Sequence, residues 1–219
     1  MLSIELITTK GTFKLDGGEW EVTNNIWLVG DESEVVVIDA AHDHLRIIEA
    51  LHGRNLRAIL LTHGHNDHIN AAIPLRDMTD APIFLHPSDQ MLWDVVWPNH
   101  KPDMHSLPND QIDVGGQRLA MIHTPGHSPG CCCFVGSNSE VVFSGDTLFC
   151  GGPGATGRSY SDEATIIQSI FSKLLVLPDS TIVHTGHGDS TTIGQERELV
   201  LEKVHEMQLN RLSEGRKPS

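Results

Sequence analysis

Three histidines and an aspartate fall within six consecutive positions of the chain: His63, His65, Asp67 and His68. They directly follow the apolar run Ala58–Leu61, which predicts a strand. At a strand end, residues i and i+2 point the same way, so His63 and His65 can share one metal ion. Asp67 and His68 fall where a helical pattern begins, so they project differently and can bind a second ion close by. Because imidazole and carboxylate are ligands that zinc selects, this cluster predicts a metal site.

Two simpler interpretations of this cluster are a solvated polar loop and a metal that only holds the fold together. A structural zinc site typically has closed four-ligand coordination, often with paired cysteines. The chain has no C-x-x-C pair, because three of its four cysteines are consecutive at 131–133 and the fourth is Cys150. The cluster therefore favours a functional metal site over a structural one.

Three further apolar runs each break into a glycine-rich turn that carries ligand-type side chains. These turns are Thr124–Gly130, Phe143–Thr147 and His184–Asp189. In each turn one potential ligand directly follows a glycine: His127, Asp146 and His187. Together with the histidine cluster, the turns give four places where an apolar strand ends in metal-binding chemistry.

Length and charge limit the kind of protein and its partners. The 219 residues can form one large core but are short for two ordinary domains, so one domain over residues 1–219 is expected. The formal net charge of -14 repels phosphate backbones and anionic lipids, so neither nucleic acid nor a membrane surface is an expected partner. The first residues lack a secretory signal and no apolar stretch approaches membrane-spanning length, so a cytoplasmic protein acting on a small molecule is expected.

Hydrophobic periodicity predicts alternating strands and helices in two halves of the chain. In the first half, strands are expected at Ile4–Thr9, Trp20–Val29, Glu34–Ile38, Ala58–Leu61 and Ile83–Leu85, and helices at Asp43–His52, Ile69–Arg76 and Ser88–Val96. In the second half, strands are expected at Gln117–Ile122, Cys131–Val135, Val141–Phe143 and Thr181–His184, and helices at Asp162–Leu175 and Gln195–Leu209. Strands grouped in this way suggest two packed sheets between helical layers, in the α/β or α+β class.

The four motifs, in this order and at these separations, resemble the metallo-β-lactamase-fold hydrolases, especially the short glyoxalase II-like branch. The resemblance spans about Asp39 to Asp189 and implies a four-layered αββα sandwich with two divalent metal ions. It implies that the first ion binds His63, His65 and His127. It implies that the second ion binds Asp67, His68 and His187, with Asp146 bridging the two. Zinc is the expected metal, while iron and manganese suit the same ligands.

The resemblance also implies an activity, in which hydroxide bridging the two ions attacks a carbonyl and Asp67 helps to orient it. A thioester suits such a site because its thiolate leaves readily. The expected substrate is thus a thioester, or a related acyl ester, of a low-molecular-weight thiol. Only 32 residues follow His187, too few for an added thiol-binding domain, so glutathione, mycothiol, bacillithiol or no thiol remain open.

Three alternative functions remain open at this point. A persulfide dioxygenase shares the fold and motifs but would hold one iron through His63, His127 and Asp146. A lactonase would use the same hydroxide on a different carbonyl. A non-enzymatic metal-binding protein would be expected to lack ligands, and here every position of the seven-ligand set has the expected residue type.

Other polar residues near the motifs are open to more than one interpretation. Asp39 resembles the family's aspartate that steadies the metal loop, with a simple strand-end cap as the alternative. The segment Gly151–Arg158 is interpreted as a substrate-lining loop rather than a phosphate-binding loop, because it lacks a Gly-Lys-Ser/Thr ending. Within or beside it, Arg158 and Tyr160 can meet an anionic or polar end of the substrate, or lie in a loop that glycine only makes flexible.

The remaining histidines, cysteines and tryptophans are expected to be structural. Surface positions are expected for His42, His44, His52, His100, His105 and His205. Packed or hydrogen-bonded roles are expected for His123 and His184, while His86 is ambiguous. Burial is expected for Cys131–Cys133. Packing is expected for Cys150, with a loop thiol near the site as the alternative. Core packing is expected for Trp93 and Trp97, with an interface or a wall of the substrate pocket as the alternatives. The oligomeric state is left open.

Overall fold

The computed structural model describes residues 3–105 and 110–214, with side chains described to residue 210. In this part of the chain, two larger sheets and a short hairpin form. The first sheet has the order β1-β2-β3-β4-β5: β1 Ser3–Leu15, β2 Gly18–Gly30, β3 Glu34–Ile38, β4 Asn55–Leu60 and β5 Ile83–Phe84. The second has the order β13-β12-β9-β8-β7-β6: β6 Gln111–Val114, β7 Gln117–His123, β8 Cys132–Gly136, β9 Val141–Gly145, β12 Ile182–Thr185 and β13 Thr191–Thr192. The short hairpin pairs β10 Leu148–Phe149 with β11 Gly152–Pro153.

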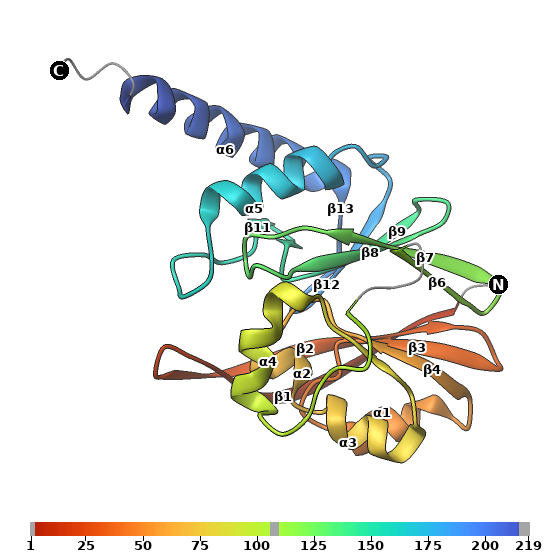
Figure 1. The fold of residues 1–219 in the computed structure, drawn as a ribbon. Coiled ribbons are helices and arrows are strands. Elements are labelled where there is room, and N and C mark those ends of the chain that lie inside the picture. Colours follow the sequence, from red (N-terminus) through yellow and green to blue (C-terminus); the bar gives the residue numbers. More distant parts are fainter. Residues whose placement is uncertain (1–2, 106–109, 215–219) are drawn as a thin grey trace.

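Helices cover the outer face of each sheet (Figure 1). The helices of the first half are α1 His44–Leu51, α2 Asn66–Ile69, α3 Ala72–Thr79 and α4 Gln90–Val96, which follows the 3₁₀ turn Pro87–Asp89. Those of the second half are α5 Glu163–Ser169, which continues as a π-helical turn Ile170–Leu174, and α6 Ile193–Glu214. The layers α1/α3, first sheet, second sheet and α5/α6 confirm the expected four-layered αββα architecture (Figure 1).

The side chains of successive residues along the inner strands point alternately to the two faces of the sheet, and this alternation produces the layers. Ile26 and Leu28 of β2 pack toward the helices of the first half, whereas Trp27 and Val29 pack toward the second sheet. Successive strand residues point to opposite faces, so a strand buried on both faces reads as an unbroken apolar run. The core between the two sheets also holds Phe134 of β8, which fixes one sheet against the other.

Most expected elements are present, and three expectations differ from the structure. The expected strands Ile4–Thr9 and Trp20–Val29 are parts of a much longer hairpin, whose turn is Asp16-Gly17. The expected helix over Ile69–Arg76 is divided at Asn70 and Ala71 between α2 and α3. The short strands β6, β10, β11 and β13 lack a period long enough to detect, and they were not expected.

The distal part of the β1–β2 hairpin projects beyond the rest of the first sheet (Figure 1). β3 pairs with β2 only from Trp27 to Gly30, so the hairpin residues before Trp27 have no third strand beside them. The hairpin therefore extends past the sheet end at which β3 and β4 stop.

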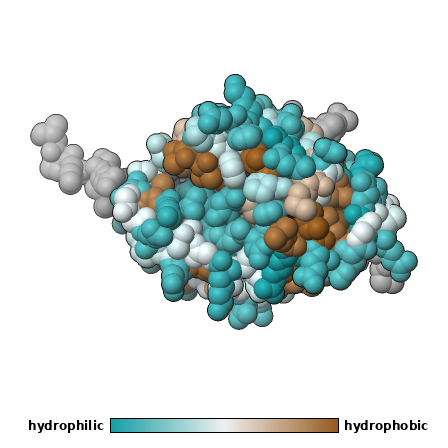
Figure 2. Space-filling view, turned by 90° about the horizontal axis from the view of Figure 1, so that it is seen from below, coloured by the Kyte–Doolittle hydropathy of each residue, from teal (hydrophilic) through white to brown (hydrophobic). Residues whose placement is uncertain are grey.

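The surface of the described residues is mainly hydrophilic, in agreement with the acidic composition. Seen from below, hydrophobic areas are separated by hydrophilic side chains (Figure 2). The exposed apolar side chains include Leu45 of α1 and Met78 of α3. No helix among the described residues is long and apolar enough to cross a membrane.

Candidate metal centre

The candidate ligands lie at one end of both sheets, five of them in loops and two, Asp67 and His68, in the short helix α2. β3 and β4 run parallel and end together, so Asp39 and the loop that begins at Thr62 lie side by side. In the second sheet β9 and β12 also run parallel, which brings Asp146 close to the turn that carries His187. Strands far apart in sequence therefore deliver their following residues to one place.

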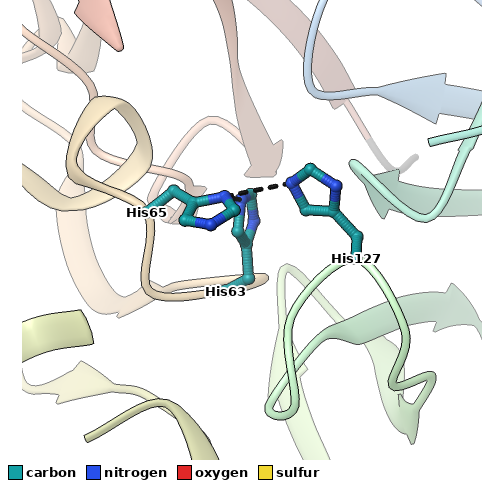
Figure 3. A group of neighbouring side chains, drawn as sticks. All are labelled: His63, His65 and His127. Carbon is teal, nitrogen blue, oxygen red and sulfur yellow. Dashed lines mark hydrogen bonds between the residues drawn. The ribbon is translucent and has the colours of Figure 1, made fainter. Parts of the chain in front are cut away.

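His63, His65 and His127 form the first group of ligand-type side chains. Their rings point toward one another from two separate loops (Figure 3). The His65 Nδ1 atom lies 3.0 Å from His63 Nε2 and 3.0 Å from His127 Nε2. His63 and His65 are buried, and His127 is 8% exposed, so these nitrogens converge at the base of the site rather than in solvent.

Asp67, His68 and His187 form a second group directly beside the first. The His68 Nε2 atom lies 3.2 Å from His187 Nε2 and 3.6 Å from Asp67 Oδ2. His187 Nε2 is 3.3 Å from the same Asp67 oxygen. Three potential ligand atoms thus form a triangle of nearly equal sides.

Asp146 lies between the two groups. Its Oδ2 atom is 3.5 Å from Nε2 of both His127 and His187, and its Oδ1 atom is 3.4 Å from His68 Nε2. One carboxylate therefore faces members of both groups. The structure brings together all seven side chains that the sequence singled out.

Asp39 orients two of the histidines from outside the groups. Its Oδ1 accepts a hydrogen bond from the Thr62 amide at 2.7 Å, and its Oδ2 accepts bonds from Thr62 Oγ1 at 2.8 Å and His68 Nδ1 at 2.9 Å. Because Thr62 Oγ1 donates to Asp39, it is free to accept from His63 Nδ1, 3.1 Å away. The protons of His63 and His68 are thereby held on Nδ1, which leaves their Nε2 lone pairs facing the cluster.

Backbone carbonyls orient two other histidines in the same way. His127 Nδ1 donates to the Ala155 carbonyl at 2.8 Å, and His187 Nδ1 donates to the Thr23 carbonyl at 2.8 Å. Each bond places the Nε2 lone pair of its histidine toward the cluster. The Ala155 bond also ties the glycine-rich loop after β11 to the site.

The electrostatics favour the ligand forms of His63, His65 and Asp67. Burial lowers the pKa of His65 to about 3 and that of His63 well below its usual range, so both rings are neutral at pH 7. Burial raises the pKa of Asp67, but the charge of His68 and a hydrogen bond from His187 outweigh it and hold that pKa at about 2. Neutral imidazole and ionised carboxylate are the forms that bind a metal. Burial lowers the pKa of His68 and His187, but the carboxylates of Asp146 and Asp67 outweigh it and raise both pKa values, so a metal ion bound there would displace a proton from each of these two rings.

Three observations of the structure indicate that these residues fit a pair of metal ions. Converging lone pairs on three imidazoles repel one another unless a cation lies between them. Among the described residues, the buried side-chain atoms without a hydrogen-bond partner all belong to this cluster: Asp67 Oδ1, Asp146 Oδ1 and His65 Nε2. A Cβ atom at Gly186 would lie 2.3 Å from Asp146 Oδ1, so glycine leaves room for the cluster. The histidine–aspartate cluster is consistent with a dinuclear metal site, and the geometry leaves the metal's identity open.

A pocket of about 290 Å³ opens onto the cluster. Besides the ligand-type residues, it is lined by Phe13, Trp20, Val22, Phe149, Ala155 and Arg158. The Arg158 guanidinium carbon lies 3.8 Å from the centroid of the Trp20 ring, a cation–π contact between the glycine-rich loop and the β1–β2 hairpin. The hairpin and the glycine-rich loop thus contact each other and together line the pocket that opens onto the cluster. Tyr160, in contrast, is exposed and lines a neighbouring hollow beside the hairpin turn.

Asp89, which no local sequence signal marks as functional, holds two ligand loops together. Its Oδ2 accepts hydrogen bonds from the Gly64 amide at 2.8 Å and Ser128 Oγ at 2.6 Å, and its Oδ1 accepts one from the Gly130 amide at 2.5 Å. Gly64 lies between His63 and His65, and Ser128 follows His127. Asp89 was read only as part of a helix, and its partners lie 25 or more residues away, so no local signal marked it.

Two expectations about other residues are wrong. His42 is not a surface residue: it is half-buried and makes hydrogen bonds to Asn24 and Asn70. Cys150 is exposed rather than packed, because it lies in the turn between β10 and β11.

Most other side-chain expectations agree with the structure. Cys131, Cys132 and Cys133 are buried. The indole of Trp93 is buried, and that of Trp97 donates to the Ile69 carbonyl. His123 bonds to the Pro129 carbonyl, and His184 packs on Trp27. His52, His100, His105 and His205 are exposed as expected, whereas His44, also expected at the surface, is partly buried. The ambiguous His86 stacks on His123 with ring centroids 4.0 Å apart.

Curated relatives of this chain carry metallo-hydrolase names. The chain is 34% identical to a hydroxyacylglutathione hydrolase, GloC, of Haemophilus influenzae, over 78% of this chain and 87% of that protein. It is 33% identical to the probable metallo-hydrolase YqgX of Bacillus subtilis, over 80% of this chain and 89% of that protein.

Solved structures share the fold. The B3 metallo-beta-lactamase BLEG-1 matches with a TM-score of 0.72 and 32% identity, over 87% of this chain and 97% of that one. TTHA1623 in a di-iron-bound form matches with a TM-score of 0.65 and 35% identity, over 80% and 92% of the two chains. ETHE1 from Myxococcus xanthus matches with a TM-score of 0.67 and 25% identity, over 86% and 80%.

A family model covers most of the chain as well. The model of the metallo-beta-lactamase superfamily matches residues 20–187, a range that includes all seven clustered side chains. With relatives above 30% identity along most of its length, the chain belongs to the metallo-beta-lactamase superfamily.

Proposed function

We propose that the protein is a dinuclear metallo-hydrolase that cleaves a thioester, or a related acyl ester, of a low-molecular-weight thiol. The observation that carries the proposal is the pair of ligand groups that share Asp146 at the base of an open pocket. The first ion would be held by His63, His65 and His127, and the second by Asp67, His68 and His187. Zinc is the proposed metal, although the TTHA1623 structure contains two irons.

Two ions held in this way would supply hydroxide at neutral pH and stabilise charge on a carbonyl oxygen. The chain's own residues prepare the site for this chemistry. Asp67 lines the pocket, and its Oδ1 has no hydrogen-bond partner, so this oxygen is available to accept a hydrogen bond from the nucleophile. With a pKa held at about 2, Asp67 stays ionised throughout the neutral range.

The pocket supports a small substrate with an apolar part. Its walls are lined by the apolar side chains of Phe13, Trp20, Val22 and Phe149. Arg158 adds one positive charge to this lining. A thioester needs little acid catalysis because its thiolate leaves without a proton. The hydroxyacylglutathione hydrolase name of the Haemophilus influenzae relative supports this substrate class.

A mononuclear iron persulfide dioxygenase is the second candidate function. The ETHE1 structure, which shares the fold at 25% identity, favours it. In that case His63, His127 and Asp146 would hold the iron. The position of His65 Nδ1, equally close to His63 and His127, supports the three-histidine set of the hydrolase instead.

A direct test is the hydrolysis of S-lactoylglutathione by metal-loaded protein, with a simple acyl ester and a glutathione persulfide assayed in parallel. The proposal expects metal-dependent thioester hydrolysis that falls by about 100-fold or more in Asp67→Asn, as is typical when a positioned catalytic group is lost. Asp77→Asn, on the exposed surface of α3, serves as the matched control and should keep full activity. Oxygen consumption with the persulfide, without ester hydrolysis, would replace the hydrolase with the dioxygenase.

A further inference from the structure

The side chain of Asn24 lies against the second ligand group although it was not expected there. Asn24 is in the middle of β2 and fully buried. Its Nδ2 atom is 3.1 Å from Asp67 Oδ2, and 3.4 Å from Nε2 of both His68 and His187. The Asn24 amide therefore contacts all three members of the second group, and its contacts with the two groups are all with the second.

Two more side chains extend from Asn24 away from the cluster. His42 Nε2 is 2.9 Å from Asn24 Oδ1, and His42 Nδ1 is 2.9 Å from Asn70 Nδ2. The backbone amide of His42 donates to Asn70 Oδ1 at 2.6 Å. The result is a continuous chain of bonds from Asn70 through His42 and Asn24 to Asp67.

A single backbone group fixes the direction of every bond in this chain. An amide N–H can only donate, so Asn70 Oδ1 must accept from His42 and Asn70 Nδ2 must donate to His42 Nδ1. The ring of His42 then carries its proton on Nε2 and donates to Asn24 Oδ1. This leaves Asn24 Nδ2 facing Asp67, so Asn24 is a hydrogen-bond donor to Asp67 and not a metal ligand.

The position of His42 is built into the fold. Its backbone has φ of +59°, a left-handed conformation that histidine adopts more readily than most residues. A Cβ atom on Gly11 of β1 would lie 2.2 Å from His42 Nδ1, so the ring needs a glycine beneath it. Burial also lowers the pKa of His42, which keeps the ring neutral with a single proton.

We propose that Asn70, His42 and Asn24 act as positioning residues that orient Asp67 and thereby set the affinity of the second metal ion. The proposal rests on the dinuclear centre of the proposed function and concerns none of its substrates. Outer partners of metal ligands typically change metal affinity by about 10-fold to 100-fold when they are removed. The hydrogen bonds from Asn70 through His42 and Asn24 reach the second group only, so their loss should leave the affinity of the first metal ion unchanged.

The test is a metal titration against a chromophoric chelator, which resolves the two dissociation constants of zinc. Asn24→Ala and His42→Gly are the disrupting variants, and glycine accepts the left-handed backbone at position 42 without strain. His42→Gln is the conservative variant, because its amide can donate to Asn24 and accept from Asn70. Thr9→Val is the matched control. It removes a buried hydrogen bond to the carbonyl of Ala41, beside His42, and leaves the hydrogen bonds between Asn70, His42 and Asn24 in place.

Both disrupting variants should weaken the second zinc about 10-fold or more while the first zinc, the Thr9→Val control and His42→Gln stay near wild type. In an Asn24→Ala background, His42→Gly should add nothing, because His42 acts through Asn24. Equal weakening of both metals, full additivity, or unchanged affinity would overturn the proposal. A wild type that binds two zinc ions without cleaving thioesters would contradict the proposed substrate alone, and one that binds a single zinc would contradict both proposals.

Discussion

Asp39 illustrates how residues that touch no substrate can determine the site. Its carboxylate accepts three hydrogen bonds at once, from the Thr62 amide and hydroxyl and from His68. These bonds connect the ends of β3 and β4 to one imidazole of each ligand group. The structure therefore supports the interpretation of Asp39 as an orienting residue rather than a simple strand-end cap.

Replacing Asp39 with asparagine should weaken metal binding without changing the size of the side chain. One of the three bonds must be lost, because an amide nitrogen cannot accept from Thr62 or His68. Metal affinity should fall by about 10-fold to 100-fold, as for other outer partners of ligands. Metal titration of Asp39→Asn checks this. Asp43→Asn, at the N-cap of α1, is the matched control, because asparagine caps a helix as well as aspartate and the same charge is removed away from the cluster. Unchanged affinity in Asp39→Asn would contradict the orienting role.

The cysteines should differ sharply in reactivity. Burial raises the pKa of Cys133 to about 11, and it raises the pKa of Cys131 and Cys132 well above the usual range of a thiol. At pH 8 these three thiols stay protonated, and the thiolate is the reactive form. Iodoacetamide should thus label only the exposed Cys150 of the native protein, as peptide mass spectrometry would show. Labelling at 131–133 without unfolding would contradict this burial.

The ligand-type residues could be predicted from the sequence, whereas their supporting residues could not. His63, His65 and His127 follow strand ends and glycines, which are local signals. Asn24 lies inside a strand that reads as core, and its relation to Asp67 depends on packing between distant segments. Local patterns carry no information on such contacts, so these residues required the folded chain.

Among the helices and strands, the β1–β2 hairpin differs most from the sequence prediction, because both of its strands are longer than expected. Residues 10–15 lack apolar alternation, since Lys10, Gly11 and Thr12 interrupt it, so the strand was ended too early. The turn itself had a signal that was overlooked. Asp16 and Gly17 have φ of +52° and +76°, the pair of left-handed residues that a two-residue type I′ turn requires, and Asp-Gly is a preferred sequence for it.

The hairpin should control substrate binding more than turnover. Trp20 lines the pocket and stacks on Arg158, but it lies outside both ligand groups. Trp20→Ala should raise KM by about 10-fold, the equivalent of losing roughly 1.4 kcal/mol of aromatic packing, with kcat changed much less. Steady-state kinetics on the preferred thioester measure both. Glu19→Ala, an exposed residue next to Trp20, should leave both constants unchanged; a drop in kcat alone for Trp20→Ala would argue against a binding role.

Asp89 should contribute to the stability of the fold by joining two loops. Asp89→Ala leaves the buried amides of Gly64 and Gly130 without an acceptor. Each unpaired buried donor costs roughly 1–3 kcal/mol, so the loss of acceptors for these two amides should lower the free energy of unfolding by about 2–6 kcal/mol. Urea unfolding of the metal-free protein measures this change. Asp94→Ala on α4, whose carboxylate accepts from Gln90 at the surface, should change it by less than about 0.5 kcal/mol.

For the whole molecule, the αββα architecture explains why the candidate centre lies where it does. Parallel strand pairs within each sheet end together, and the core between the sheets holds the two sets of ends face to face. Ligand groups from both sheets therefore converge although more than 120 residues separate His63 from His187. The four-layered arrangement was predictable from the motifs, while a single domain over residues 1–219 stays a prediction.

The most direct test of the account is the metal content of untagged protein, measured by inductively coupled plasma mass spectrometry together with the protein concentration. A dinuclear centre should give two equivalents of divalent metal per chain, with zinc predominant, and His187→Ala should lose one equivalent. A single equivalent of iron per chain, unchanged in His187→Ala, would contradict the dinuclear centre.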